Sequence, residues 1–205
     1  MLTFMKRIPF LLAAVSLLAS CAETSLIDTW RNPSIPAHRF QKLLVVAIAK
    51  SAESRRVYED VLASELSQRG VEAVQGSNYI SGKADRQTLE KAVKAAGAEG
   101  VVTIQTVRVD RQTAMQPGYM NTYPGYWYPP AFPSWNFYGY YGSYYEPAYT
   151  YTYDVATIEA HLFEAGSGKL IWAATFETSE PGRVLSVSKD LSSKIVHSLA
   201  KDGLI

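Results

Sequence analysis

The sequence is poor in the residues that form covalent crosslinks and metal sites. Its 205 residues include one cysteine, Cys21, and three scattered histidines, His38, His161 and His197. A single thiol excludes an internal disulfide and any zinc site built on several thiolates. We therefore predict no disulfide framework and no metal site.

Neither sign of charge is in excess. The chain carries 20 Lys and Arg against 19 Asp and Glu, which is a formal net charge of +1. A dedicated nucleic-acid-binding protein would show a strong basic excess to match the phosphates, so no nucleic-acid partner is expected. The hydrophobic content of 47% is that of a globular protein.

Recognisable catalytic motifs are also absent. The chain lacks Gly-x-x-x-x-Gly-Lys-Ser/Thr and Gly-x-Gly-x-x-Gly, and it lacks Gly-x-Ser-x-Gly and His-Glu-x-x-His. Glu159 and His161 lie two apart on one strand face and form an acid–base pair in principle. Because nothing else supplies a nucleophile or an oxyanion donor, a solvated strand face is the favoured interpretation. The sequence predicts a protein that is not an enzyme and has no cofactor.

One long segment has no charge at all. No charged side chain occurs in the 34 residues from Gln112 to Tyr145, and 12 of the 14 tyrosines lie between Tyr119 and Tyr153. Repeated prolines prevent a regular helix or an interior strand. Loops beyond about 12–15 residues inside a compact domain are usually functional or disordered. We predict a Tyr/Pro/Gly-rich insertion over residues 112–148.

Three interpretations of this insertion are open. It is a low-complexity flap on its own sheet, a surface for a protein partner, or an aromatic surface for glycans or lipid headgroups. Tyrosine and tryptophan offer large contact area at low entropy cost, so we predict contact with an envelope protein or a glycan. The residues expected to make this contact are Tyr119, Tyr123, Tyr126, Trp127, Tyr128, Trp135, Tyr138, Tyr140 and Tyr141.

The N-terminus has the pattern of a bacterial lipoprotein signal. Two basic residues, Lys6 and Arg7, precede an apolar run that is too short to span a bilayer as a helix. Small residues then stand directly before Cys21. This pattern predicts a signal peptide over residues 1–20 and a Cys21 whose several acyl chains anchor the protein in the lipid bilayer. An ordinary signal peptide followed by a chance cysteine is the alternative.

The mature chain is predicted to form a tether and one domain. Residues 21–41 contain two prolines and no hydrophobic period, so we expect a lipidated tether. Residues 42–205 are expected to form a single α+β domain. Its predicted strands cover residues 43–49, 71–74, 101–109, 149–163 and 170–176, and its helices lie between Ser51 and Gly70, between Asp85 and Gly97, and from Val184 to Gly203.

The expected order is β-α-β-α-β-β-β-α. It predicts a mixed five-stranded sheet with helices packed on it, and a long aromatic loop between the third and fourth strands. On the first helix, the i,i+4 pair Arg55 and Glu59 is expected on the solvent side. In the hairpin's return strand, Trp172 is expected to point into the core with Leu170, Ala174 and Phe176.

The strand over residues 149–163 is unusual in its pattern. Aromatic and apolar residues occupy one set of alternate positions as far as Val155, and the other set from Ala156 onwards. Such a change indicates a β-bulge near residues 155–157, or a strand that changes which of its faces is covered.

Five short stretches of the chain occur together in a known family. They are Thr29-Trp30, Leu44-Val45-Val46, Arg55-Arg56-Val57-Tyr58-Glu59-Asp60, Ala98-Glu99-Gly100-Val101-Val102, and the hairpin from Phe163 to Trp172. With these stretches, residues 26–205 resemble a family of small proteobacterial lipoproteins that carry a domain of unknown function. The wider architecture is similar to the N-terminal domain of the Tol translocation protein, to the curli secretion lipoprotein and to a lipoprotein activator of penicillin-binding proteins.

The resemblance implies a protein that binds partners or assembles rather than one that catalyses a reaction. Ala22 rather than aspartate follows Cys21, which, by resemblance to enterobacterial sorting rules, implies the cell outer membrane with the domain facing the periplasm. We therefore predict a non-enzymatic outer-membrane lipoprotein that binds an envelope protein or a glycan through its aromatic loop. The alternative is a structural subunit of an envelope secretion or assembly complex.

Overall fold

The computed structural model describes residues 24–36, 38–81, 86–116, 119–120, 145–146 and 149–205. Among them, one mixed sheet of six strands has the order β1-β8-β7-β4-β2-β3. Its strands are β1 (Thr24–Arg31), β2 (Lys42–Ile48), β3 (Glu72–Gln75), β4 (Gly100–Gln116), β7 (Tyr149–Glu164) and β8 (Leu170–Ser179). A second, two-stranded sheet pairs β5 (Tyr119–Met120) with β6 (Tyr145–Glu146).

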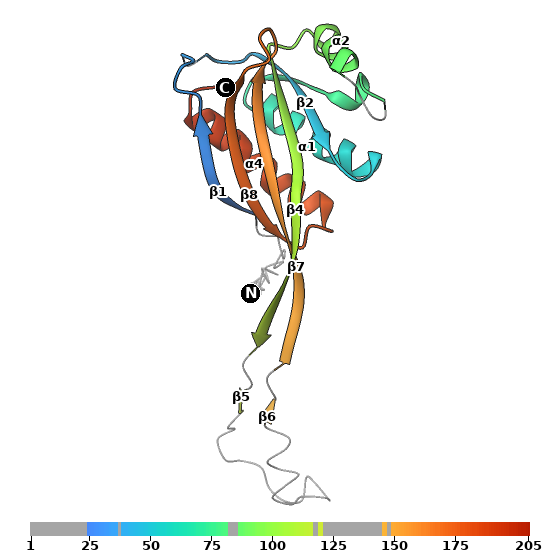
Figure 1. The fold of residues 1–205 in the computed structure, drawn as a ribbon, viewed down its shortest axis with the longest axis vertical. Helices are drawn as coiled ribbons and strands as arrows, with labels where there is room; N and C mark the ends of the chain where they lie inside the picture. The colour runs from blue at the N-terminus through green and yellow to red at the C-terminus, as the bar shows by residue number, and fades with distance from the viewer. Residues whose placement is uncertain (1–23, 37, 82–85, 117–118, 121–144, 147–148) are drawn as a thin grey trace, which may run out of the picture.

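The helices are α1 (Ala52–Gln68), α2 (Arg86–Ala96) and α4 (Val184–Lys201), with a short 3-10 turn η1 (Gly76–Asn78) after β3. Strand β2 pairs in parallel with both β3 and β4, because α1 and α2 form the crossovers between these strands. The other pairings in the six-stranded sheet are antiparallel. The helices α1 and α4 lie together on one face of the sheet (Figure 1).

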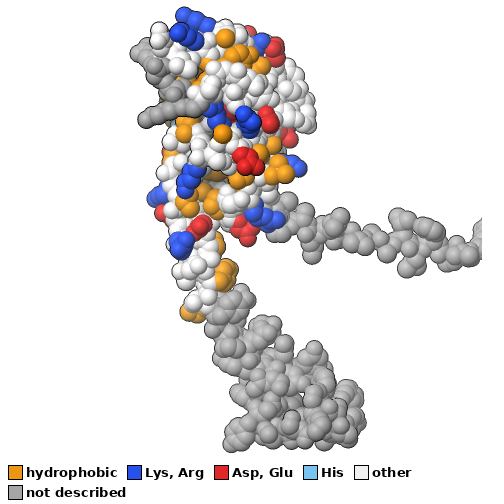
Figure 2. All heavy atoms as spheres, turned by 90° about the vertical axis from the view of Figure 1, so that its right-hand side faces the viewer, with side chains coloured by type: hydrophobic (Ala, Val, Ile, Leu, Met, Phe, Trp, Pro, Cys, Tyr) orange, Lys and Arg blue, Asp and Glu red, His pale blue; other side chains and the backbone are white. Residues whose placement is uncertain are grey.

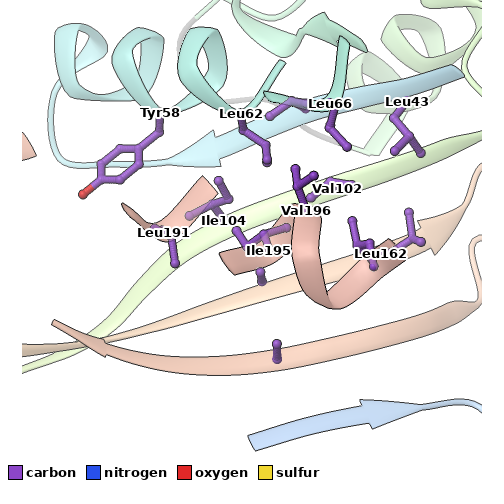
Figure 3. Close-up of a cluster of buried hydrophobic side chains, with 14 of the residues drawn as sticks. Leu43, Tyr58, Leu62, Leu66, Val102, Ile104, Leu162, Leu191, Ile195 and Val196 are labelled. Carbon is purple, nitrogen blue, oxygen red and sulfur yellow. The ribbon is translucent and has the colours of Figure 1, made fainter. Parts of the chain in front are cut away.

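The hydrophobic core lies between this helical layer and the sheet. Alternate residues of the strands, such as Leu43, Val102 and Leu162, meet Leu62 of α1 and Ile195 of α4 (Figure 3). All five side chains are completely buried. At roughly 25 cal/mol per Å² of apolar surface removed from water, such contacts provide most of the stability of the domain.

The predicted sheet of five strands is wrong by one strand. Residues 24–31, placed in the tether by the sequence, form β1, which pairs with β8 at the edge of the sheet. A register shift at Ile27 interrupts the alternation of β1, and most of its side chains are exposed. An edge strand with a bulge has no period-two pattern to recognise, which is why sequence reasoning missed it.

The first residue of β1 is tied into the domain. The backbone N–H of Thr24 donates to Asp190 of α4 at 2.8 Å, and its hydroxyl donates to that of Thr178 at 3.2 Å. Asp190 also accepts a hydrogen bond from Lys194 at 2.7 Å. Partial burial by itself would raise the pKa of Asp190, but the hydrogen bonds from Lys194 and Thr24 outweigh it and hold this pKa below its ordinary value. Thr24, three positions after Cys21 in the sequence, is therefore held against α4 and β8.

The pattern change predicted for residues 149–163, which form most of β7, coincides with a bulge in the neighbouring strand β4. Residues 155–157 of β7 pair without a break with β8, whereas the register with β4 shifts between Thr106 and Arg108. The bulge therefore lies at Val107 of β4, opposite the position where it was expected. Strand β7 itself stays regular: the face with Ala156, Ile158 and Leu162 is buried, whereas Tyr151, at the other set of positions, is 47% exposed.

The pair of Arg55 and Glu59 forms as predicted, but not on the solvent side. The Arg55 Nε lies 2.8 Å from Oε1 of Glu59, whose side chain is 0% exposed. The same carboxylate accepts hydrogen bonds from the backbone N–H groups of Ala47 at 3.1 Å and Ser77 at 2.7 Å. The turn η1 lies against the end of β2 and covers the side of α1 that carries Glu59. The i,i+4 spacing within α1 could not predict this contact, because η1 follows in a later part of the chain.

Candidate functional site: an aromatic arm

Strands β4 and β7 continue beyond the rest of the sheet as a two-stranded ribbon. The last residue of β8 that pairs with β7 is Ser179, opposite Val155. Beyond this point β4 and β7 pair as strands with each other, from Arg111 with Asp154 to Gln116 with Tyr149, and the last backbone contact with the β8 segment is the N–H of Glu180 donating to the carbonyl of Asp154. We call residues 111–116 and 149–154 the aromatic arm. Six residues per strand at about 3.4 Å each carry it roughly 20 Å from the body (Figure 1).

In the arm, the tyrosines of β7 alternate with polar residues, whereas the residues of β4 show no such alternation. Tyr151 and Tyr153 share one face, with ring centroids 6.0 Å apart, and the hydroxyl of Tyr153 donates to Gln112 at 3.0 Å. Arg111 and Asp154 form an exposed ion pair with an N–O distance of 3.3 Å. Met115, which is 70% exposed, pairs in register with Thr150, so it lies on the opposite face from Tyr151.

Among the described residues, the apolar side chains of the arm do not form a hydrophobic core. Tyr151 is 47% exposed, and hydrophobic side chains are visible on the described part of the arm below the body (Figure 2). An isolated two-stranded ribbon is marginally stable in water, and an exposed ion pair such as that of Arg111 contributes only about 0–1 kcal/mol. These properties are typical of an element that is stabilised by contact with something else.

The arm leaves the domain at the end where β1 begins. Thr24 pairs with Thr178, Thr178 with Ala156, and Ala156 with Val109, so all four residues lie in one row across the sheet. The arm starts two residues beyond this row. Figure 1 shows the start of β1 and the arm at one end of the sheet, and α2 with the β7–β8 turn at the other. A chain that enters through Thr24 therefore reaches the domain next to the base of the arm.

Most of the residues predicted for partner contact lie outside the described residues. Tyr119 lies in β5 and pairs with Glu146 of β6. Cys21 and the other predicted contact residues fall in segments that the structure does not describe, namely Tyr123, Tyr126, Trp127, Tyr128, Trp135, Tyr138, Tyr140 and Tyr141.

Sequence reasoning missed the part of the arm formed by β4. It ended the third strand at Val109, whereas β4 continues to Gln116. The bulge at Val107 separates this extension from the recognisable β-branched run. The available signal was that no glycine or proline interrupts the chain between Val109 and Gln116.

The other candidate residues do not form a site. Nε2 of His161 lies 3.6 Å from Oε2 of Glu159, so the two residues do share a face, and both side chains are partly exposed on a sheet face away from α1 and α4. His38 and His197 are exposed. In the described ranges, no group of three or more His, Cys, Asp or Glu residues is arranged to hold a metal ion. No described helix is long and apolar enough to cross a membrane.

No protein-family model and no curated protein matches this chain. Solved structures with a similar arrangement of elements include the PelC dodecamer from Paraburkholderia phytofirmans, at 14% identity and a TM-score of 0.44 over 89% of this chain and 99% of that one. Lipoprotein GNA1162 from Neisseria meningitidis matches at 15% identity and a TM-score of 0.39, over 81% and 99%. A neuraminyllactose-binding hemagglutinin homolog from Helicobacter pylori matches at 10% and 0.39, over 82% and 89%. Likenesses of this degree leave the function open.

Proposed function

We propose that this protein is a non-enzymatic lipoprotein of the cell envelope that binds a partner through its aromatic arm and the uncharged segment that the arm carries. The observation that supports this most is the arm itself, a ribbon with exposed apolar side chains on both faces and no core. Aromatic side chains are enriched at protein interfaces because they bury much area with few rotatable bonds. The proposed partner is an envelope protein or a glycan.

The position of β1 adds a constraint on where this partner lies. Thr24 is the first residue of β1 and is held by Asp190, and it follows Cys21 by three residues. Three residues span at most about 11 Å. If Cys21 is acylated and inserted in the outer membrane, the end of the domain that bears the arm is held close to the periplasmic surface of that membrane. The arm then meets its partner near the membrane rather than far into the periplasm.

The lipid anchor is tested by the variant Cys21→Ala. We expect the variant to be released from the membrane fraction or to stall before signal cleavage, because several acyl chains are needed for stable anchoring. The measurement is fractionation of cells followed by the mass of the mature N-terminus, with Ser25→Ala, at an exposed position of β1, as a control that keeps the thiol and the signal. A variant that stays with the outer membrane like the wild type would contradict the proposed anchor.

Binding through the uncharged segment is tested by removing residues 117–148, which leaves the aromatic arm itself in place. Gln116 and Tyr149 are paired, so a two-residue Asn-Gly turn can replace residues 117–148 without moving either strand. We expect the melting temperature to stay within about 3 °C, because closure entropy depends only weakly on loop length. Crosslinking in intact cells should then lose the partner that the wild-type protein captures.

A matched control replaces the same residues with a Gly/Ser linker of equal length. The proposal requires that both variants lose the crosslinked partner, since the aromatic side chains and not the length make the contact. A shortened protein that folds and still crosslinks as the wild type does would refute the proposed role of the segment. A shortened protein that fails to fold would show instead that the segment is part of the core.

The alternative function is a structural subunit of an envelope secretion or assembly complex. Strand β1 favours it, because among the described residues β1 pairs with β8 alone and its other edge has no strand beside it, with Leu26, Ile27 and Trp30 exposed. An open edge strand is able to pair with another chain. Sedimentation of the full-length protein distinguishes the two: a monomer favours the partner-binding function, and a closed ring favours the alternative.

A further inference from the structure

A groove of about 960 Å³ runs along the sheet face opposite to α1 and α4. Its floor is the outer face of β2, where Leu44, Val46 and Ile48 project at alternate positions. From Leu44 to Ala49 the floor covers five residue steps, about 17 Å at roughly 3.3 Å per residue. The volume is at the upper end of the range of about 300–1,000 Å³ for small-molecule sites.

The two sides of the groove are also apolar. Leu89 and Val93 of α2 line one side, and Val101 of β4 and Phe163 of β7 line the other. Leu89 is 40% exposed although it belongs to the apolar side of its helix. An elongated groove with aliphatic and aromatic walls favours a long hydrocarbon chain as the occupant.

The lining includes one cation that is mostly buried and incompletely paired. The side chain of Arg55 is 16% exposed, and its Nε donates to Glu59. Its Nη2 atom is buried without a hydrogen-bond partner among the described residues. The acidic residues of the lining, Glu90 and Glu164, both interact with other residues of the chain. A guanidinium with an unused N–H group is suited to bind a carboxylate by donating a hydrogen bond to it.

A peptide strand is a poor occupant for this groove. Strand β2 pairs with β4 from Leu43 to Ile48 and with β3 as far as Val45, and the N–H of Ala47 donates to Glu59, so little of its backbone is left to pair with a peptide. A peptide lying on this floor would bury its own N–H and C=O groups without partners, which costs free energy for each group. An acyl chain has no such groups.

We propose that the groove binds a long-chain fatty acid, with the acyl chain along β2 and the carboxylate at Arg55. Arg55 stands in the first turn of α1, directly after the end of β2, so the charged end of the ligand is placed at the carboxyl end of the strand that forms the floor. Ligands of sheets with parallel strands commonly lie at this position. Val46 and Ile48 are then covered by the chain of the ligand instead of by water.

The test is calorimetric titration of the complete mature chain carrying Cys21→Ala, which keeps detergent out of the measurement. The two probes are palmitate and hexadecanol, which share the hydrocarbon chain and differ in the charged group. We expect palmitate to bind with one molecule per chain and about tenfold or more tighter than hexadecanol, because hydrogen bonds to charged groups are the stronger ones. If palmitate did not bind to this protein, the proposal would be overturned, and the groove would be filled by solvent.

Three variants separate the two halves of the site. Arg55→Gln keeps a donor for Glu59 and is expected to weaken palmitate about tenfold while leaving hexadecanol unchanged. Leu89→Gln should weaken both probes about fivefold or more, because it places an amide in the path of the chain. The matched control is Ala95→Gln, on an exposed position of α2 outside the groove, and should weaken neither.

The outcomes are decisive even if Arg55→Gln fails to fold. Leu89 is partly exposed, so the Leu89→Gln variant is expected to fold. If Leu89→Gln and Ala95→Gln bound palmitate with equal affinity, the placement of the acyl chain beside α2 would be overturned. Equal binding of palmitate and hexadecanol by the wild type would overturn the role of Arg55. Because the groove shares no residue with the arm, failure of either proposal leaves the other intact.

Discussion

Replacing Trp172 with alanine is expected to lower the free energy of unfolding by about 3–5 kcal/mol, as truncation of large aromatic side chains in protein cores does. Trp172 is completely buried in β8, and its Nε1–H donates to Oδ2 of Asp202 at 3.0 Å, just after the end of α4. The variant would leave a large cavity and an unpaired Asp202. Since domains are stable by only about 5–15 kcal/mol, a large part of the stability would be lost.

The measurement is urea denaturation followed by circular dichroism, because the variant lacks a fluorescent side chain of the wild type. Trp30→Ala is the matched control. Trp30 pairs with Ala173, the residue after Trp172, but it is 45% exposed, so we expect a loss of about 1 kcal/mol or less. A loss below about 1 kcal/mol for Trp172→Ala would contradict its assignment to the core.

Replacing Glu59 with alanine is expected to cost a similar amount, about 3–5 kcal/mol, for an electrostatic reason. Its carboxylate pairs with Arg55 and accepts the backbone N–H groups of Ala47 and Ser77. Removing it leaves a mostly buried positive charge and two backbone donors without their acceptor. Gly76 permits this arrangement, because a Cβ there would lie 2.9 Å from the carbonyl oxygen of Val45 and 3.3 Å from Glu59.

Two further variants show whether the loss comes from the buried carboxylate. Glu59→Gln keeps an acceptor oxygen and should lose less than Glu59→Ala. Glu53→Ala removes an exposed glutamate from the first turn of the same helix and should cost about 0.3–1 kcal/mol, its effect on the helix dipole. Similar melting curves for Glu59→Ala and Glu53→Ala would contradict the role of Glu59 in joining β2, α1 and η1.

The sequence by itself determined the elements whose signal is local. The repeats of apolar residues in α1 and α4, and the apolar run of β2, depend only on neighbours a few positions apart, and the structure confirms each of these elements. The same holds for the β7–β8 hairpin, where Gly168 adopts a φ of 69° in the turn and Trp172, Ala174 and Phe176 are buried in the core. The prediction is wrong for Leu170, because a register shift at Ile171 places Leu170 opposite Phe163, and Ile171 is buried instead. The partner-binding role of the uncharged segment and the acylation of Cys21 stay predictions.

Only the tertiary structure decided the features that depend on distant parts of the chain. Strand β1 exists because β8 offers it an edge, and Glu59 is buried because η1 closes over it, although its spacing from Arg55 is typical of an exposed pair. The arm extends beyond the rest of the sheet because β8 ends at Ser179. The sequences of β4 and β7 do not show where β8 ends. The groove needs β2, β4, β7 and α2 together. The hydrophobic periodicity of a helix or strand predicts which of its residues share a face. Whether that face is buried or paired depends on which other elements the fold places against it.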